Sequence, residues 1–204
     1  MTATSNPRIG VLGIQGDYAA HAAALAEAGA EAVDVRKPED LEGLDGLILP
    51  GGESTTMLRF LERHGLFERL REFAANKPVF GTCAGTILLA KEVRNPAQRS
   101  LGVLNAAVER NAYGRQIDSS IQTEPTALPG GPMEMVFIRA PRIVQIGEGV
   151  EALATRDGFP VLVHQGNIVA ATFHPELSPD RRVHRYFVGI VNRLRRENPE
   201  TDED

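Results

Sequence analysis

The sequence predicts an α/β protein with an open, mostly parallel sheet, helices on both faces of that sheet and extra antiparallel strands in the second half of the chain. Two features carry this prediction. Through the first half, short apolar runs alternate with stretches of helical periodicity, whereas beyond residue 94 strand-like runs follow one another between glycine and proline turns. The length of 204 residues favours a single domain. We expect it over residues 8–196, between polar tails at 1–7 and 197–204.

Four strands are expected in the first half, each an apolar run that ends at a turn. They are Ile9–Gln15, Glu31–Arg36, Leu44–Leu49 and Pro78–Phe80. The alanine-rich stretch Tyr18–Ala28 predicts a helix, with Asp17 as its N-cap and Gly29 as its stop.

The apolar residues from Met57 to Phe73 recur with helical spacing, and a break is expected near Gly65. Ala84–Val93 predicts another helix after a tight turn. The chain closes with an expected helix at Asp180–Arg196, whose apolar stripe should face the core. Strands are expected between these last two helices at Ala106–Arg110, Met133–Ile138, Ile143–Ile146, Pro160–His164 and Ile168–Phe173.

The composition excludes several classes of protein. Twenty-two Lys and Arg residues against 27 Asp and Glu leave a net charge of −5, and no basic patch for a nucleic-acid backbone stands out. No apolar run approaches the roughly 20 residues of a membrane helix, and the polar N-terminus lacks the apolar core of a signal peptide. The single cysteine rules out an internal disulfide and zinc sites with two or more thiolates. These features predict a soluble, cytoplasmic globular protein.

Cys83 lies in the segment FGTCAG, directly after an apolar strand and before a helix. Glycines two residues before and two residues after it permit a sharp strand-to-helix turn, which lifts the side chain from the sheet edge to a helix N-terminus. There the helix dipole favours the thiolate, the form that attacks carbonyl carbons. A buried structural cysteine is the alternative, but the strand–turn–helix context favours a nucleophile.

A cysteine nucleophile needs a base, and His174 is the strongest candidate among five histidines. It follows an apolar strand, and Pro175 favours an extended conformation for it. In an extended segment residues i and i+2 project to the same side, so Glu176 can hold one imidazole nitrogen while the other faces the thiol. A plain turn after the strand is the alternative. The remaining histidines are not assigned to the site: His21, His64 and His184 are expected at the surface or the edge of the core, and His164 ends a strand.

A second polar segment, Pro50–Thr56 (PGGESTT), follows another expected strand. Its two glycines let backbone N–H groups approach a ligand and point at an oxyanion. A helix start with Ser54 or Thr55 as N-cap is the alternative, and both interpretations can hold at once. The segment lacks the Gly-Lys-Ser/Thr ending of a phosphate loop.

These motifs together resemble those of class I glutamine amidotransferases: GTCAG around Cys83, FHPE ending at Glu176, and LPGGEST at Leu49–Thr55. More closely, the chain resembles the family of glutaminase subunits of the ribose 5-phosphate-dependent pyridoxal 5′-phosphate synthase. VERNAYGRQ at Val108–Gln116 and FIRAP at Phe137–Pro141 mark that family more specifically than the triad motifs do. The similar segments span roughly residues 8 to 195.

The resemblance implies a flavodoxin-like fold and hydrolysis of glutamine by Cys83, with His174 and Glu176 as its partners. It also implies a glutamine pocket, an oxyanion hole of backbone N–H groups and a contact with the synthase. The residues implied are Gly51, Gly52, Glu53, Arg110, Ile138 and Arg139 for the pocket, Gly52 and Ala84 for the oxyanion hole, and Gln15 and Gly16 for the contact.

The partner implied by the resemblance is a barrel-shaped synthase subunit in a large hetero-oligomer. That subunit would combine the ammonia with ribose 5-phosphate and glyceraldehyde 3-phosphate. Neither a metal nor an organic cofactor is expected on this chain.

Two other functions stay open. The same triad could serve a different synthase, as in tryptophan, GMP or histidine biosynthesis. Alternatively, the chain could be a non-catalytic or chaperone-like protein of the same architecture, with Cys83 as a redox sensor. The HPE segment argues against a sensor, because a sensor needs no carboxylate to orient a histidine.

Overall fold

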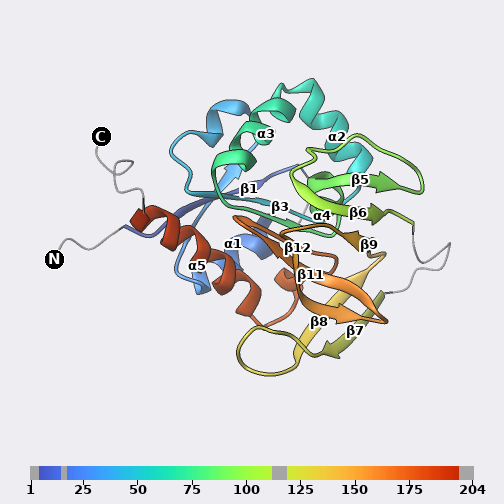
Figure 1. The fold of residues 1–204 in the computed structure, drawn as a ribbon. Helices are drawn as coiled ribbons and strands as arrows, with labels where there is room; N and C mark the ends of the chain where they lie inside the picture. Colours follow the sequence, from blue (N-terminus) through green and yellow to red (C-terminus); the bar gives the residue numbers. More distant parts are fainter. Residues whose placement is uncertain (1–4, 15–17, 112–118, 198–204) are drawn as a thin grey trace.

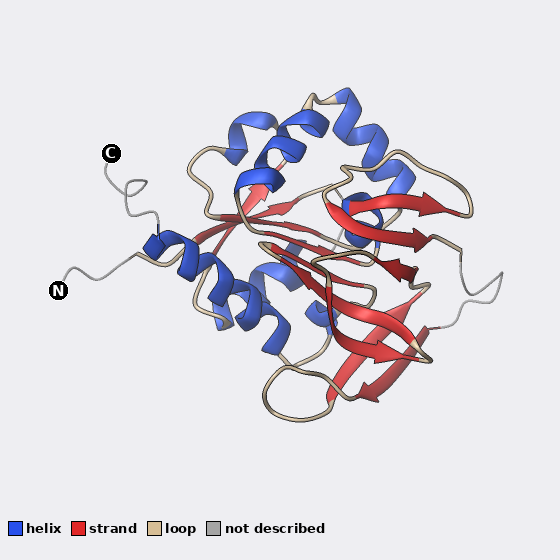
Figure 2. Ribbon diagram, viewed as in Figure 1, coloured by secondary structure: helices blue, strands red, loops and turns tan. Residues whose placement is uncertain are grey.

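The computed structural model describes residues 5–14, 18–111 and 119–197. Its centre is a seven-stranded sheet in the order β10-β11-β12-β4-β3-β1-β2 (Figures 1 and 2). The five strands from β12 to β2 run parallel, whereas β11 is antiparallel to β12 and to β10. The mostly parallel sheet with added antiparallel strands is therefore confirmed. Its strands are β1 (Arg8–Leu12), β2 (Glu31–Val35), β3 (Gly46–Leu49), β4 (Val79–Thr82), β10 (Glu151–Arg156), β11 (Phe159–Gln165) and β12 (Ile168–Ala171).

Helices cover both faces of this sheet (Figure 2). On one face lie α2 (Ser54–Arg63), α3 (Leu66–Asn76) and α4 (Ala84–Leu89), and on the other lie α1 (Tyr18–Glu27) and α5 (Arg182–Glu197). Each face has its own apolar core, because buried side chains of the helices pack against the strands on either side. The stripe on α5 belongs to the second core, as predicted, and comprises Val183, Phe187, Ile190, Val191 and Leu194.

Two smaller groups of strands flank the main sheet (Figure 1). A three-stranded sheet pairs β5 (Ala90–Arg94) in parallel with β6 (Leu104–Glu109), and β6 antiparallel with β9 (Arg142–Ile146). The second group is the antiparallel pair of β7 (Ser119–Glu124) and β8 (Met133–Ile138). Two short 3₁₀ turns complete the described part of the chain, η1 (Pro38–Leu41) and η2 (Pro175–Leu177).

The predicted helix at Ala84–Val93 is wrong in its second half, because α4 ends at Leu89 and the chain continues as β5. The last carbonyl groups of α4 bond to the following segment instead of continuing the helix. Leu101 N–H donates to Leu88 O (2.7 Å) and Val103 N–H donates to Leu89 O (3.1 Å). Two strands, β7 and β10, have no counterpart in the prediction. β7 is mostly polar and alternates only between exposed and half-buried positions, so its sequence carries little apolar signal.

Several predicted boundaries are confirmed. Gly65 separates α2 from α3 in the left-handed conformation, with a φ of 68°, and Gly29 follows α1 with a φ of 83°. Asp17, expected as the N-cap of the first helix, lies outside the described residues. Within the described ranges, no helix combines the length and the apolar character needed to cross a membrane.

The fold brings the carboxyl ends of β3, β4 and β12 side by side. The register pairs Leu49 with Gly81 and Thr82 with Ala171, so these neighbouring parallel strands end at the same edge of the sheet. In open α/β sheets this edge is where ligands bind. The segments that contain Glu53, Cys83 and His174 follow these three strands, whereas Arg110 and Arg139 follow β6 and β8.

Candidate active site

Cys83 occupies the sharp turn between β4 and α4 that the sequence predicts. Its backbone has a φ of 47° and a ψ of −103°, a conformation that residues other than glycine rarely adopt. Its N–H donates to Ala171 O of the neighbouring strand at 2.8 Å. The residue is 7% exposed. Strain of this kind persists where the surroundings enforce it, and it concentrates at functional sites.

The glycines that flank Cys83 serve close packing of the helix on the sheet. A Cβ atom on Gly85 would lie 1.9 Å from the carbonyl oxygen of Leu49, and one on Gly81 would lie 2.7 Å from Cδ1 of Leu89. Cys83 itself, not either glycine, has the positive φ. The glycines therefore let α4 approach β3 and β4, which holds the turn in its strained form.

His174 and Glu176 form the pair that the sequence predicts. His174 Nδ1 lies 2.7 Å from Glu176 Oε1, and both residues are buried. The contact is made by a 3₁₀ turn rather than by an extended segment, because Pro175 begins η2 and Leu177 N–H bonds back to His174 O. His174 itself is non-helical, with a φ of −108° and a ψ of 84°. The predicted contact is thus confirmed, although the local geometry that produces it differs.

The surroundings of His174 favour its charged form. Burial alone would lower its pKa, but hydrogen bonds and charges from Cys83 and Glu176 oppose burial and raise the pKa to about 10. An imidazolium at neutral pH stabilises a thiolate beside it. Cys83 and the buried carboxylate of Glu176 thus both act on the His174 ring.

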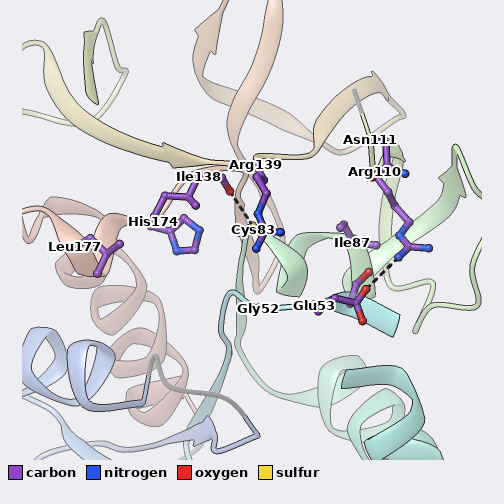
Figure 3. A pocket seen from close by; sticks show the side chains of 11 residues that line it. Gly52, Glu53, Cys83, Ile87, Arg110, Asn111, Ile138, Arg139, His174 and Leu177 are labelled. Carbon is purple, nitrogen blue, oxygen red and sulfur yellow. Dashed lines mark hydrogen bonds and ion pairs between the residues drawn. The ribbon is translucent and has the colours of Figure 1, made fainter. Parts of the chain in front are cut away.

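A cavity of about 320 Å³ lies in front of this pair (Figure 3). Cys83 and His174 face it from one side, and Figure 3 shows Arg110 and Glu53 paired on the other side. The thiol Sγ lies 3.9 Å from Ile138 O. The lining residues are Gly52, Glu53, Ser54, Cys83, Ile87, Arg110, Asn111, Ile138, Arg139, His174 and Leu177.

Glu53 is the N-cap of α2, so the predicted N-cap at Ser54 or Thr55 is wrong. Its carboxylate accepts the backbone N–H groups of Thr55 (3.1 Å) and Thr56 (2.7 Å). Burial opposes ionisation, but the hydrogen bonds from Thr56 and Thr55 outweigh it and lower the pKa of Glu53 to about 2. Arg110 completes this wall of the cavity, with Nη2 2.7 Å from Thr55 Oγ1 and 3.4 Å from Glu53 Oε1.

Most of the expected pocket residues come together, since Gly52, Glu53, Arg110, Ile138 and Arg139 all line the cavity. Arg139 has a positive φ of 45° and is, with Cys83, a strained residue at the site. Two expected residues lie beside the cavity without lining it: Gly51 is buried at the end of β3, and Ala84 is buried at the start of α4. The expected partner contacts Gln15 and Gly16 lie outside the described residues.

Sequence reasoning missed four residues that line the cavity: Ser54, Ile87, Asn111 and Leu177. Ile87 lies one helical turn after Cys83, so helical spacing could have identified it. Asn111 and Leu177 each directly follow an expected site residue. Leu177 is also unusual for a large apolar residue in being 47% exposed.

The expectation for His21 and His184 is wrong, because both side chains are fully buried. His21 Nδ1 lies 3.1 Å from His184 Nε2. No group of three or more His, Cys, Asp and Glu side chains in the described segments could hold a metal ion.

Comparison with known proteins extends these observations. The model of the SNO glutamine amidotransferase family matches residues 11–193. The chain is 59% identical over 184 residues to a pyridoxal 5′-phosphate synthase subunit PdxT from Koribacter versatilis, covering 90% of this chain and 95% of that protein. It is 55% identical over 186 residues to the protein of the same name from Thermotoga maritima, covering 90% and 99%.

Solved structures agree with these matches. A crystal structure of a glutamine amidotransferase superposes with a TM-score of 0.83 at 48% identity, covering 90% of this chain and 98% of the other. A putative GMP synthase protein from Thermoplasma acidophilum has a TM-score of 0.74 at 18% identity, covering 97% and 100%, which shows a shared fold. From the extent of the family match and the identity to these relatives, the chain belongs to the SNO glutamine amidotransferase family.

Proposed function

We propose that the chain is the glutaminase subunit of a pyridoxal 5′-phosphate synthase, hydrolysing L-glutamine to L-glutamate and ammonia with Cys83, His174 and Glu176. The strained Cys83 beside the buried His174–Glu176 pair, at one side of a cavity, carries this proposal. The names of the relatives support the assignment to this synthase. Membership of the SNO glutamine amidotransferase family supports the hydrolysis of glutamine.

The first half-reaction transfers the acyl group to the enzyme. The Cys83 thiolate attacks the side-chain amide carbon of glutamine, and the carbonyl oxygen becomes an oxyanion. The His174 imidazolium then gives its proton to the amide nitrogen as the C–N bond breaks. The products are ammonia, a thioester on Cys83 and a neutral imidazole.

The second half-reaction releases glutamate. Neutral His174 removes a proton from water, and the resulting hydroxide attacks the thioester carbon. The C–S bond breaks, Cys83 leaves as a thiolate and His174 is again an imidazolium. Glu176 holds the Nδ1 side of the ring throughout, so that Nε2 remains available to the reacting groups.

The cavity supplies groups for both ends of glutamine. We assign Gly51, Gly52, Glu53, Arg110, Ile138 and Arg139 to binding, with the two guanidinium groups suited to the substrate carboxylate. The oxyanion is assigned to backbone N–H groups of Gly52 and Ala84. Ala84 is the first residue of α4, where an N–H group has no acceptor within the helix.

The ammonia would pass to a barrel-shaped synthase subunit within a large hetero-oligomer, with Gln15 and Gly16 at the contact. A lone cysteine that acts as a thiolate suits a reducing compartment, and we assign the chain to the cytoplasm. Residues 8–196 form a single domain in this proposal.

The proposal is tested by measuring glutamate release from L-glutamine, with and without the synthase partner and its two sugar phosphates. Cys83→Ala should abolish glutamate release while still binding the synthase. Stimulation by the synthase, with pyridoxal 5′-phosphate formed, is the expected result for wild type. Turnover by Cys83→Ala would refute the nucleophile, and glutaminase activity that the synthase leaves unchanged would refute the partner. No glutamate under either condition would favour the non-catalytic alternative.

A further inference from the structure

Two buried histidines lie directly behind the Cys83–His174–Glu176 triad. His21 comes from α1 and His184 from α5, and both side chains are fully buried. Phe80 packs edge-on against both rings, at 6.5 Å from His21 and 5.8 Å from His184 between ring centroids. Burial lowers the pKa of His21 well below its usual range and that of His184 to about 3. Both rings are therefore neutral at pH 7, and each carries one N–H.

The triad carboxylate has an oxygen that the triad does not use. Oε1 of Glu176 bonds to His174, whereas Oε2 is buried and has no hydrogen-bond partner in the parts of the chain that the structure describes. A buried carboxylate oxygen without a donor is costly. His21 Nε2 lies 3.6 Å from this oxygen, and both side chains are fully buried.

The tautomers of the two histidines follow from their contact. If His184 Nε2–H donates to His21 Nδ1, then His21 carries its proton on Nε2, facing the unused carboxylate oxygen. The opposite assignment turns a lone pair of His21 toward the carboxylate. It also leaves a proton on His184 Nδ1, which is buried without a partner among the described residues. Since buried N–H groups without acceptors are rare, the first assignment is favoured.

We infer that His21, oriented by His184, is a positioning residue that donates from Nε2 to Oε2 of Glu176 and so fixes the carboxylate that holds His174. The inference rests on the proposed function, because it assigns the support of the same triad. At 3.6 Å the contact is longer than a hydrogen bond by about 0.6 Å. Catalytic hydrogen bonds are often long in the absence of substrate and tighten in the complex with it. Thr82 Oγ1, at the end of β4, lies 3.4 Å from the same nitrogen and within hydrogen-bond distance of it. The N–H on Nε2 of His21 therefore faces both the Thr82 hydroxyl and the Glu176 carboxylate.

Substitutions at His21 separate positioning from packing. His21→Gln keeps an N–H near the place of Nε2, His21→Asn keeps one near Nδ1 only, and His21→Leu keeps none. The measurement is glutamate release in the presence of the synthase subunit. For His21→Leu and His21→Asn we expect a kcat about 10- to 100-fold lower than that of wild type, with a nearly unchanged KM. Losses of this size are found when a residue that orients a metal-bound histidine is replaced. His21→Gln should recover most of the lost kcat. His64→Gln, at an exposed histidine, is the control and should match wild type.

The tautomers have a direct readout. In protein with ¹⁵N-labelled histidine, we expect both His21 and His184 to carry the proton on Nε2 at pH 7. A proton on Nδ1 of His21 would overturn the inference, because Nε2 would then have nothing to donate.

The outcomes also separate this inference from the proposed function. Turnover by Cys83→Ala would refute the proposed function. Equal kcat values for His21→Gln and His21→Asn, with Cys83→Ala inactive, would refute only the positioning role. This comparison remains decisive if His21→Leu fails to fold, because the two amide variants are similarly polar. A loss confined to KM would likewise overturn the inference.

Discussion

His174 owes its charge to two neighbours that can be removed one at a time. Hydrogen bonds and charges from Cys83 and Glu176 overcome burial and raise its pKa to about 10, so the imidazolium is present throughout the physiological range and is lost only as the pH rises through that value. Cys83→Ala removes one of these two neighbours. We therefore expect the pKa of His174, followed by NMR of the imidazole, to be lower in this variant than in wild type. The same pKa of His174 in both proteins would contradict the contribution of Cys83.

The two partners of Cys83 should contribute unequally. His174→Ala removes the proton carrier for both half-reactions, whereas Glu176→Gln keeps the base and weakens only its orientation. In the serine protease subtilisin the corresponding losses differ by a factor between about 10 and 100. We expect Glu176→Gln to keep a higher kcat than His174→Ala by a factor in that range, measured as glutamate release. Equal losses would refute this division of roles.

At the scale of elements, the contact between α4 and β3 depends on a missing side chain. A Cβ atom on Gly85 would lie 1.9 Å from Leu49 O, a backbone atom that cannot move aside by itself. Gly85→Ala should lower the free energy of unfolding by about 3 kcal/mol, at the upper end for overpacking. The control is Gly189→Ala on α5, where the added Cβ meets nothing within 4 Å. That variant should be more stable than wild type by up to about 1 kcal/mol. The midpoints of denaturation of the two variants and of wild type test this prediction. Similar midpoints for Gly85→Ala and Gly189→Ala would contradict the packing argument.

The start of α2 should respond to acid through Glu53. Its pKa of about 2 is below the ordinary value of 4.5, so its contribution to stability is present above pH 4.5 and is lost as the pH falls toward 2. Glu53→Ala should lower the free energy of unfolding by about 1 kcal/mol at pH 7, as for other N-cap losses. The difference from wild type should shrink when denaturation is repeated near pH 2.5. A difference independent of pH would show that the cap works without its charge.

At the scale of the whole molecule, the two apolar cores share one sheet and should unfold together. Leu61 on α2 and Leu25 on α1 are fully buried on opposite faces. Replacing either by Ala should cost about 2–5 kcal/mol and shift a single transition followed by far-UV circular dichroism. Two separate transitions in either variant would contradict a single domain.

The sequence predicts the half of the molecule in which local signals agree. The parallel strands and their helices follow from apolar periodicity, and Cys83, His174 and Glu176 from motifs at the ends of strands. The path after Leu89 could not be predicted, because the helical pattern continues to Val93 while long-range hydrogen bonds from Leu101 and Val103 end the helix. The buried His21–His184 pair could not be predicted for a similar reason, because its two residues are 163 positions apart in the sequence.

The chain has a single cysteine, and that cysteine is the proposed nucleophile. A thiol-specific alkylating reagent can therefore modify only one place, and each adduct detected by mass spectrometry removes one active site. The fraction of chains modified should equal the fraction of glutaminase activity lost. In an assembly of any size, the adducts found on this chain would count its working sites without knowledge of the stoichiometry.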